Sequence, residues 1–128
     1  MSLRSPLSRV LYLGSAHSGV EHWWIERVSS VALLPLTIWL LVALLRLPLG
    51  DHAAVTAWIG AGIHPVLLAL FVVIACRHSQ LGVQMVIEDY VHAHGSKLFT
   101  LLLSNFAHVL LAASGVYAVL RIALRSVG

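Results

Sequence analysis

Residues 28–45 form a run of eighteen residues without a single charged side chain, and this run restricts the fold more than any other feature. A helix rises about 1.5 Å per residue, so such a run, with slight help from its flanks, crosses a hydrocarbon core about 30 Å thick. Residues 98–120 form a second uncharged run, between Lys97 and Arg121. We predict membrane-spanning helices at about 26–47, where Pro35 is expected to introduce a kink, and at about 97–122.

The region between these two spans is less simple. The stretch "HPVLLALFVVIAC" (64–76) is apolar but too short to cross a membrane. Continued through residue 87 it is long enough, although it then carries Arg77 and His78 into the membrane. The alternative is two short pieces joined by a turn at "RHSQ", but that stretch contains neither Gly nor Pro. We therefore predict one helix at about 64–90, with Pro65 in its first turn.

The expected fold is all-α: an integral membrane bundle of three transmembrane helices. Residues 1–24 are interpreted as a polar N-terminal arm and residues 25–128 as the membrane domain, with loops at 46–63 and 91–96. The chain is 59% hydrophobic and 10% charged, against about 45–50% and about 25% in soluble domains. A net charge of +3, thinly scattered, argues against nucleic-acid binding and leaves the lipid bilayer as the expected surroundings.

Two further bounds come from charge placement and cysteine content. The single cysteine, Cys76, excludes an internal disulfide and a Cys-rich metal cage. Cytoplasmic loops are richer in Lys and Arg than loops on the other side. Since four cations lie on the side of the N-terminus and three on the other, we predict a cytoplasmic N-terminus. The predicted cytoplasmic side carries Arg4, Arg9, Arg27 and Lys97, and the other side Arg46, Arg121 and Arg125.

Two of the polar residues of the middle span, His78 and Asp89, lie on one helix face, together with Leu81, Gly82 and Met85. Eleven residues at ~100° each almost complete whole turns, so His78 and Asp89 point the same way, about 16 Å apart. A neutral imidazole can ligate haem iron, and Gly82, one turn on, would leave room for a flat macrocycle. The spacing alone favours the alternative, in which His78 hydrogen-bonds a neighbouring helix and Gly82 is a packing notch. His108 is the only other candidate ligand and is better interpreted as an interhelical hydrogen-bonding residue, so a second ligand would come from another chain.

Polar groups at the ends of the spans suggest a further site. Tyr90 could donate a hydrogen bond to a carbonyl oxygen of a lipophilic quinone, and Asp89 could orient it or relay a proton. An ordinary helix end with an interfacial tyrosine remains open. Arg27 could pair with a carboxylate, a haem propionate or, by default, a lipid phosphate.

The segment "HSQLGVQMVIEDYV" resembles the signature of the smaller (D-type) membrane-anchor subunit of succinate dehydrogenase, complex II. That family has a haem-ligating His, a Gly four residues on, and Asp-Tyr eleven and twelve residues after the His, which are the spacings of His78, Gly82, Asp89 and Tyr90. The stretch "EHWWIERVSSVALLPLTIW" (21–39) is similar to the first helix of bacterial members, with Arg27 at the usual arginine position.

The resemblance implies a function and a set of partners. The chain would be half of a two-subunit anchor in the bacterial inner membrane, paired with a second (C-type) anchor subunit that shares a haem b. A flavoprotein and an iron–sulfur subunit would dock on the cytoplasmic face, and electrons from succinate would pass to ubiquinone.

Individual residues acquire roles from the same resemblance. His78 would be the axial ligand of the haem iron, Tyr90 and Asp89 would hold the quinone, and Arg27 would lie near the haem propionates or the quinone. The chain would have no catalytic centre of its own.

Three other functions remain open at this stage. The chain could anchor a fumarate reductase, which runs the reverse reaction on a related plan. It could be a structural anchor without a cofactor, in which His78 only packs. It could also be a small transporter subunit with a proton path through Asp89 and His78, although three spans and no internal repeat argue against this.

Overall fold

The computed structural model describes the backbone of residues 16–127, with side chains from Gly19 onward except that of His22. Four helices make up this part of the chain: α2 (Ala16–Arg46), α3 (His52–Gly60), α4 (His64–Tyr90) and α5 (His94–Val127). Three of them are long and apolar enough to cross a membrane, over Gly19–Arg46, His64–Tyr90 and His94–Val127. The predicted all-α bundle with three spans is confirmed.

The middle span is one unbroken helix, as predicted. α4 starts with Pro65 in its first turn and continues through Arg77 and His78 to Tyr90. Proline suits this first turn because the N–H that it lacks would have no partner there. Nothing in "RHSQ" interrupts the backbone ladder, so the polar side chains of this stretch are carried on a continuous helix.

The first span is longer than its apolar run. α2 begins at Ala16, ten residues before the predicted start at 26, and continues past Pro35 to Arg46. Helix therefore extends into the part of the chain assigned to a polar arm. Residues 1–15 of that arm lie outside the described residues, and the division into arm and membrane domain stays a prediction.

The segment 46–63 is not a simple loop, which corrects the prediction. It contains the nine-residue helix α3, and Asp51 caps the start of this helix. Its side chain accepts hydrogen bonds from the backbone N–H groups of Ala53 (2.9 Å) and Ala54 (3.2 Å), which otherwise lack partners at a helix start. Gly62, with a φ of 54°, then turns the chain into α4.

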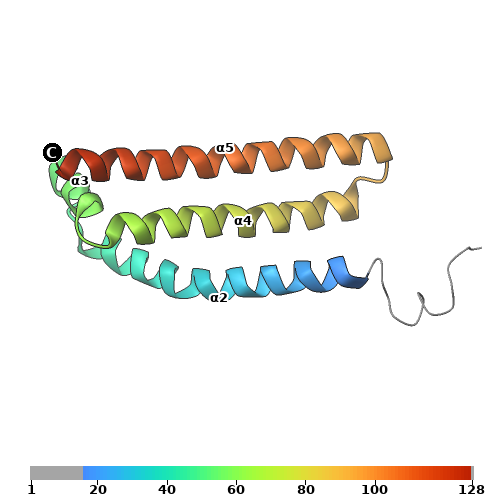
Figure 1. Cartoon of the computed structure of the whole chain (residues 1–128), viewed down its shortest axis with the longest axis horizontal. Coiled ribbons are helices and arrows are strands. Elements are labelled where there is room, and N and C mark those ends of the chain that lie inside the picture. The colour runs from blue at the N-terminus through green and yellow to red at the C-terminus, as the bar shows by residue number, and fades with distance from the viewer. Residues whose placement is uncertain (1–15, 128) are drawn as a thin grey trace, which may run out of the picture.

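An aromatic stack fixes α3 against the two neighbouring spans. Trp58 of α3 stacks on Trp39 of α2 at 5.6 Å and on His64 of α4 at 4.4 Å between ring centroids. Nδ1 of His64 also donates to the Trp58 carbonyl at 2.8 Å. α3 lies at the end of the bundle that is farthest from the start of α2 (Figure 1).

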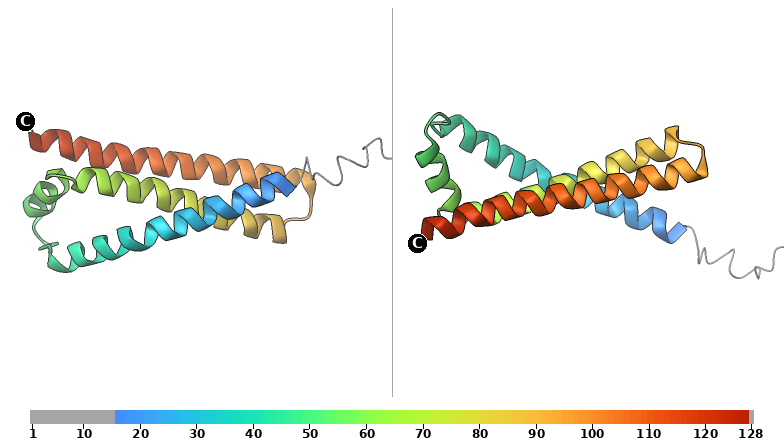
Figure 2. Two further views of the ribbon diagram at one scale, coloured as in Figure 1. Left: turned by 60° about the horizontal axis from the view of Figure 1, so that its bottom comes forward. Right: turned by 90° about the horizontal axis from the view of Figure 1, so that it is seen from above.

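α4 lies between the other two spans. It contacts α2 on one side and α5 on the other, whereas α2 and α5 do not contact each other within residues 16–127. The three views agree on this arrangement (Figures 1 and 2). The start of α2, the end of α4 and the start of α5 share one end of the bundle, and α3 and the C-terminus share the other.

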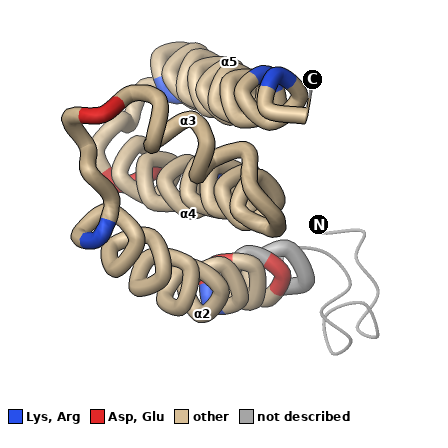
Figure 3. The backbone as a smooth tube through the Cα atoms, turned by 90° about the vertical axis from the view of Figure 1, so that its left-hand side faces the viewer, with Lys and Arg blue, Asp and Glu red and all other residues tan. Residues whose placement is uncertain are grey.

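The three spans enclose very little. In the described part of the chain the buried residues are Leu81, Ile87 and Ser29. Charged residues are sparse along the backbone, which is mostly tan in Figure 3. Large apolar side chains cover the outside of every span, as expected where lipid or another membrane protein surrounds the helices.

α4 and α5 approach each other closely at Gly115. A Cβ added there would lie 2.7 Å from Cγ1 of Val72. Small residues at such positions allow two membrane helices to approach closely. Gly115 is therefore a packing glycine of this bundle.

We predict that Gly115→Ala destabilises the bundle. The new methyl group must displace a short, branched side chain, and overpacking typically costs about 1–3 kcal/mol. The apparent melting temperature of the protein in detergent should fall. Gly95→Ala is the matched control on the same helix, because a Cβ there meets nothing within 4 Å. An equal response of the two variants would contradict this packing role.

Candidate functional site

The polar stripe predicted for the middle span lies on one continuous helix. Since α4 runs unbroken from His64 to Tyr90, His78, Gly82 and Asp89 share a face by helical geometry. Gly82 and Asp89 are exposed and His78 is half-buried. The α4 face that carries these residues therefore remains partly open in this chain.

Gly82 lies beside free space. A Cβ added at Gly82 would meet no atom within 4 Å, in contrast to the crowded position of Gly115. Gly82 is therefore not a packing notch for the helices of this chain. Its missing side chain opens a surface that a flat cofactor or a helix of another chain can approach closely.

His78 is held by a residue that the sequence analysis did not identify. Its Nδ1 lies 3.1 Å from Oγ of Ser29 on α2. Ser29 is 7% exposed, which makes it the buried polar residue of the described chain. Its hydroxyl also donates to the backbone carbonyl of Glu26 at 2.9 Å. In the sequence, the only sign of this role is that Ser29 is a polar residue inside the apolar run 28–45.

The ring of His78 has its second nitrogen available. Among the described residues, no hydrogen bond reaches Nε2 of His78, while Nδ1 is engaged by Ser29. A histidine that ligates a metal typically uses one ring nitrogen and donates a hydrogen bond from the other. No group of three or more His, Cys, Asp or Glu side chains gathers within residues 16–127. The described residues therefore form no metal cage, and a lone histidine such as His78 fits a haem, which takes one ligand from each side.

His108, the other candidate ligand, is engaged at both nitrogens. Nε2 lies 3.2 Å from Oγ of Ser79 on α4, and Nδ1 donates to the Ser104 carbonyl at 2.8 Å. A second interhelical bond nearby joins Gln80 to Asn105 at 2.6 Å. His108 therefore serves as a link between α4 and α5, which agrees with its interpretation from the sequence.

Arg77, whose role the sequence left open, belongs to the same network. Its guanidinium donates to the side-chain oxygen of Gln80 at 2.9 Å. Gln80 in turn donates to Asn105 on α5. Arg77 also lines a groove between α2 and α4, so its guanidinium is linked to α5 only through Gln80.

Asp89 and Tyr90 lie where α4 ends. The helix is closed by the N–H of Val91, which donates to the Ile87 carbonyl at 2.9 Å. Tyr90 is 79% exposed, and Asp89 is exposed as well. The helix rise places Tyr90 about 18 Å along the axis from His78. Both side chains are available to groups outside this chain.

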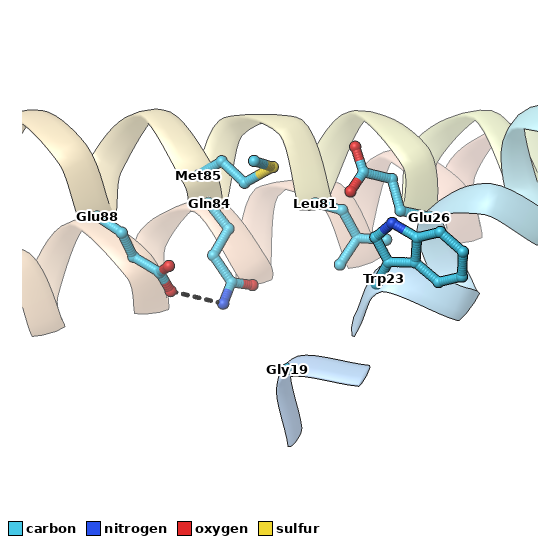
Figure 4. Close-up of a pocket in the computed structure, with 7 residues that line it drawn as sticks. All are labelled: Gly19, Trp23, Glu26, Leu81, Gln84, Met85 and Glu88. Atoms are coloured by element: carbon cyan, nitrogen blue, oxygen red, sulfur yellow. Dashed lines mark hydrogen bonds between the residues drawn. The ribbon is translucent and has the colours of Figure 1, made fainter. Parts of the chain in front are cut away.

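A groove between α2 and α4 lies near the same end. It has a volume of about 480 Å³. Figure 4 shows Leu81 beside the Trp23 ring and Gln84 next to Glu88 farther along α4. The side-chain amide of Gln84 donates a hydrogen bond to the Glu88 carboxylate at 2.9 Å. The groove is lined by Gly19, Trp23, Glu26, Leu81, Gln84, Met85 and Glu88.

Arg27 is not brought next to His78. It is exposed, and its guanidinium lies 5.2 Å from the ring centroid of Trp23 on the same helix. Ser29 faces α4, and two residues at ~100° each place Arg27 on nearly the opposite side of α2. Any contact of Arg27 with a cofactor would therefore be made on an outer surface of α2.

Comparison with known proteins shows the family to which the sequence is similar. Residues 1–113 match the family model described as succinate dehydrogenase/fumarate reductase transmembrane subunit. The succinate dehydrogenase hydrophobic membrane anchor subunit of Paracoccus denitrificans is 31% identical over 115 residues, covering 90% of this chain and 88% of that protein. The subunit of the same name from Rickettsia conorii is 35% identical over 82 residues, covering 63% of this chain and 65% of that protein. No solved structure matches the chain.

The family assignment agrees with the resemblance seen in the sequence and with the three-span fold. The matched residues include α2, α3, α4 and most of α5. All the α4 candidates from His78 to Tyr90 thus lie inside the matched region. With three membrane-spanning helices and relatives that are named as membrane anchors, this chain belongs to the family of succinate dehydrogenase/fumarate reductase transmembrane subunits.

Proposed function

We propose that the chain is the hydrophobic membrane-anchor subunit of a succinate dehydrogenase, and that it helps to bind haem b and ubiquinone. In this role it assists the passage of electrons from succinate oxidation to the quinone pool. The observation that carries the proposal is the combination of His78 and Gly82 on α4. Nε2 of the histidine is available, and one turn away the backbone borders open space.

In the proposed site His78 would hold the haem iron through its Nε2. When bound, the haem supplies a one-electron carrier in the membrane. This chain contributes one nitrogen ligand, the cleared surface at Gly82 and an apolar helix face. The second ligand comes from a C-type anchor subunit.

Tyr90 is the proposed hydrogen-bond donor to a quinone carbonyl. Its position at the end of α4 suits a substrate whose tail lies in lipid and whose ring lies near the interface. Donors that are fixed in an apolar site favour the negative charge that develops on a carbonyl oxygen during reduction. Asp89, the neighbouring carboxylate, orients the phenol or relays a proton to it.

Arg27 is proposed to contact a haem propionate or the quinone. Its exposed guanidinium has a planar fork that binds carboxylates in pairs of hydrogen bonds, which lysine cannot reproduce. Because Arg27 lies on the outer side of α2, this contact requires a group that is held between this chain and a partner.

The proposed complex lies in the bacterial inner membrane with the N-terminus in the cytoplasm. An iron–sulfur subunit and a flavoprotein subunit dock on that face. Arg27 and Lys97 lie towards the same end of the bundle, and Arg46, Arg121 and Arg125 towards the other, as the charge count assumed. Arg4 and Arg9, which complete the count, lie outside the described residues.

Two alternative functions are also considered. The family description includes fumarate reductase, so an anchor of that enzyme is the second candidate, and it would be recognised by the physiological direction of turnover. A structural anchor without a cofactor is favoured by one observation, because a bond to Ser29 is also what a packing histidine makes.

We predict that His78→Ala removes haem b from the assembled complex. The change deletes the proposed ligand, so the reduced-minus-oxidised haem spectrum should be lost or strongly altered. His108→Ala is the matched control, because it deletes a membrane histidine that bonds to Ser79 and Ser104. It should keep a normal spectrum.

Gly82→Leu tests the same site independently. Because the added side chain meets open space in this chain, loss of haem would point to a clash with the cofactor or its partner. Normal haem content in both His78→Ala and Gly82→Leu would overturn the haem proposal and leave the structural anchor.

We predict that Tyr90→Phe slows ubiquinone reduction at least about tenfold. A hydrogen bond to a charged acceptor contributes about 1.5–3 kcal/mol, and 1.36 kcal/mol corresponds to tenfold in rate. Succinate oxidation with an artificial acceptor that takes electrons upstream of the quinone should be unchanged. Tyr117→Phe is the matched control, because Tyr117 is an exposed tyrosine on α5 far from the end that carries Tyr90.

The two activities of Tyr90→Phe distinguish the outcomes. If ubiquinone reduction is unaffected, or if both activities fall together through poor assembly, Tyr90 is only an interfacial anchor.

A further inference from the structure

We infer that Ser29 is a positioning residue for His78, an inference that rests on the proposed function of His78 as a haem ligand. The hydroxyl of Ser29 accepts a hydrogen bond from the Nδ1–H of His78. This bond keeps the proton on Nδ1 and the lone pair on Nε2, which is the tautomer that a metal ligand requires.

The contact joins two separate spans. Ser29 lies on α2 and His78 on α4, 49 residues apart, and their polar atoms are 3.1 Å apart. Ser29 is 7% exposed. An oxygen that is shielded from water and lipid must find its partners inside the protein, so this bond contributes to the relative placement of the two helices.

The bonding capacity of the hydroxyl decides the direction of the bond. A serine hydroxyl has one proton to donate and can also accept. The backbone carbonyl of Glu26, 2.9 Å away, can only accept. Ser29 can satisfy both contacts at once only if it donates to this carbonyl and accepts from His78. Nδ1 is then the protonated nitrogen of the ring.

A neighbouring serine provides a natural comparison. Ser30 donates to the same Glu26 carbonyl at 2.8 Å, but it is exposed. It shares the helix, the residue type and the acceptor with Ser29. The two residues differ in burial and in the contact with His78, which only Ser29 makes.

The bond has two consequences for the ligand. It restricts rotation of the imidazole, and donation from Nδ1 raises the basicity of Nε2. A more basic ligand favours the oxidised iron over the reduced iron. Loss of the acceptor should therefore raise the haem midpoint potential and allow an external ligand to displace His78 more readily.

The test compares Ser29→Ala, Ser29→Thr and Ser30→Ala in the intact, haem-loaded complex. The readouts are the haem midpoint potential and the carbon monoxide concentration that half-converts the reduced haem. For Ser29→Ala we expect a raised potential and conversion at about tenfold lower carbon monoxide, because loss of such a supporting bond typically weakens metal binding 10–100-fold. Ser29→Thr keeps the oxygen, so it should resemble the wild type, as should Ser30→Ala.

Two results would overturn the inference. One is a Ser29→Ala complex that matches the wild type in both readouts. The other is an equal shift in Ser30→Ala, which would assign the effect to the Glu26 carbonyl. If Ser29→Ala does not assemble, Ser29→Cys decides, because its sulfur has nearly the same shape and is a weak acceptor. A shift in the same direction supports the inference, and no shift overturns it.

The His78→Ala variant distinguishes failure of the role of Ser29 from failure of the proposed haem site. If His78→Ala loses its haem while Ser29→Ala behaves as the wild type, His78 remains the ligand and only the role of Ser29 is refuted. If His78→Ala keeps its haem, the proposed function itself fails.

Discussion

A bilayer offers no water to polar groups, and this constraint determines both the backbone and the side chains of the protein. Backbone N–H and C=O groups must pair within each helix, so the three spans are helical from end to end. The same requirement applies to polar side chains at membrane depth. Three pairs meet it between neighbouring helices: Ser29 with His78, Gln80 with Asn105, and Ser79 with His108.

These pairs explain how α4 can hold His78, the proposed ligand, in place although the bundle has almost no interior. With so few buried apolar residues, packing alone does little to fix the rotation of α4 about its axis. Hydrogen bonds to α5 on one side and to α2 on the other restrict that rotation. Gly115 also lets α5 approach Val72 closely, whereas the α4 face at Gly82 borders open space.

The sequence predicted features that depend on local pattern. A continuous α4 followed from the absence of Gly and Pro in "RHSQ", and the shared face of His78 and Asp89 followed from helical periodicity. α3 was missed because a nine-residue helix lies below the length of a span, although Asp51 before "HAAV" is an N-cap signal. Ser29 could not be identified as the partner of His78, because the relative rotation of two helices is set by their packing. For the same reason the direction of Arg27, away from His78, was not predictable.

The exposure of the candidate residues bears on how the site works. Tyr90 is 79% exposed, and Gly82 borders open space, whereas a donor that favours charge on a quinone oxygen acts strongly only where water is excluded. This chain alone therefore supplies the orientation of the groups but not their low-dielectric surroundings. In the proposed function those surroundings would come from lipid and from the proposed second anchor subunit over the open face of α4. Assembly then has an energetic role in the proposed function, because the hydrogen bond from Tyr90 becomes strong only when the complex is complete.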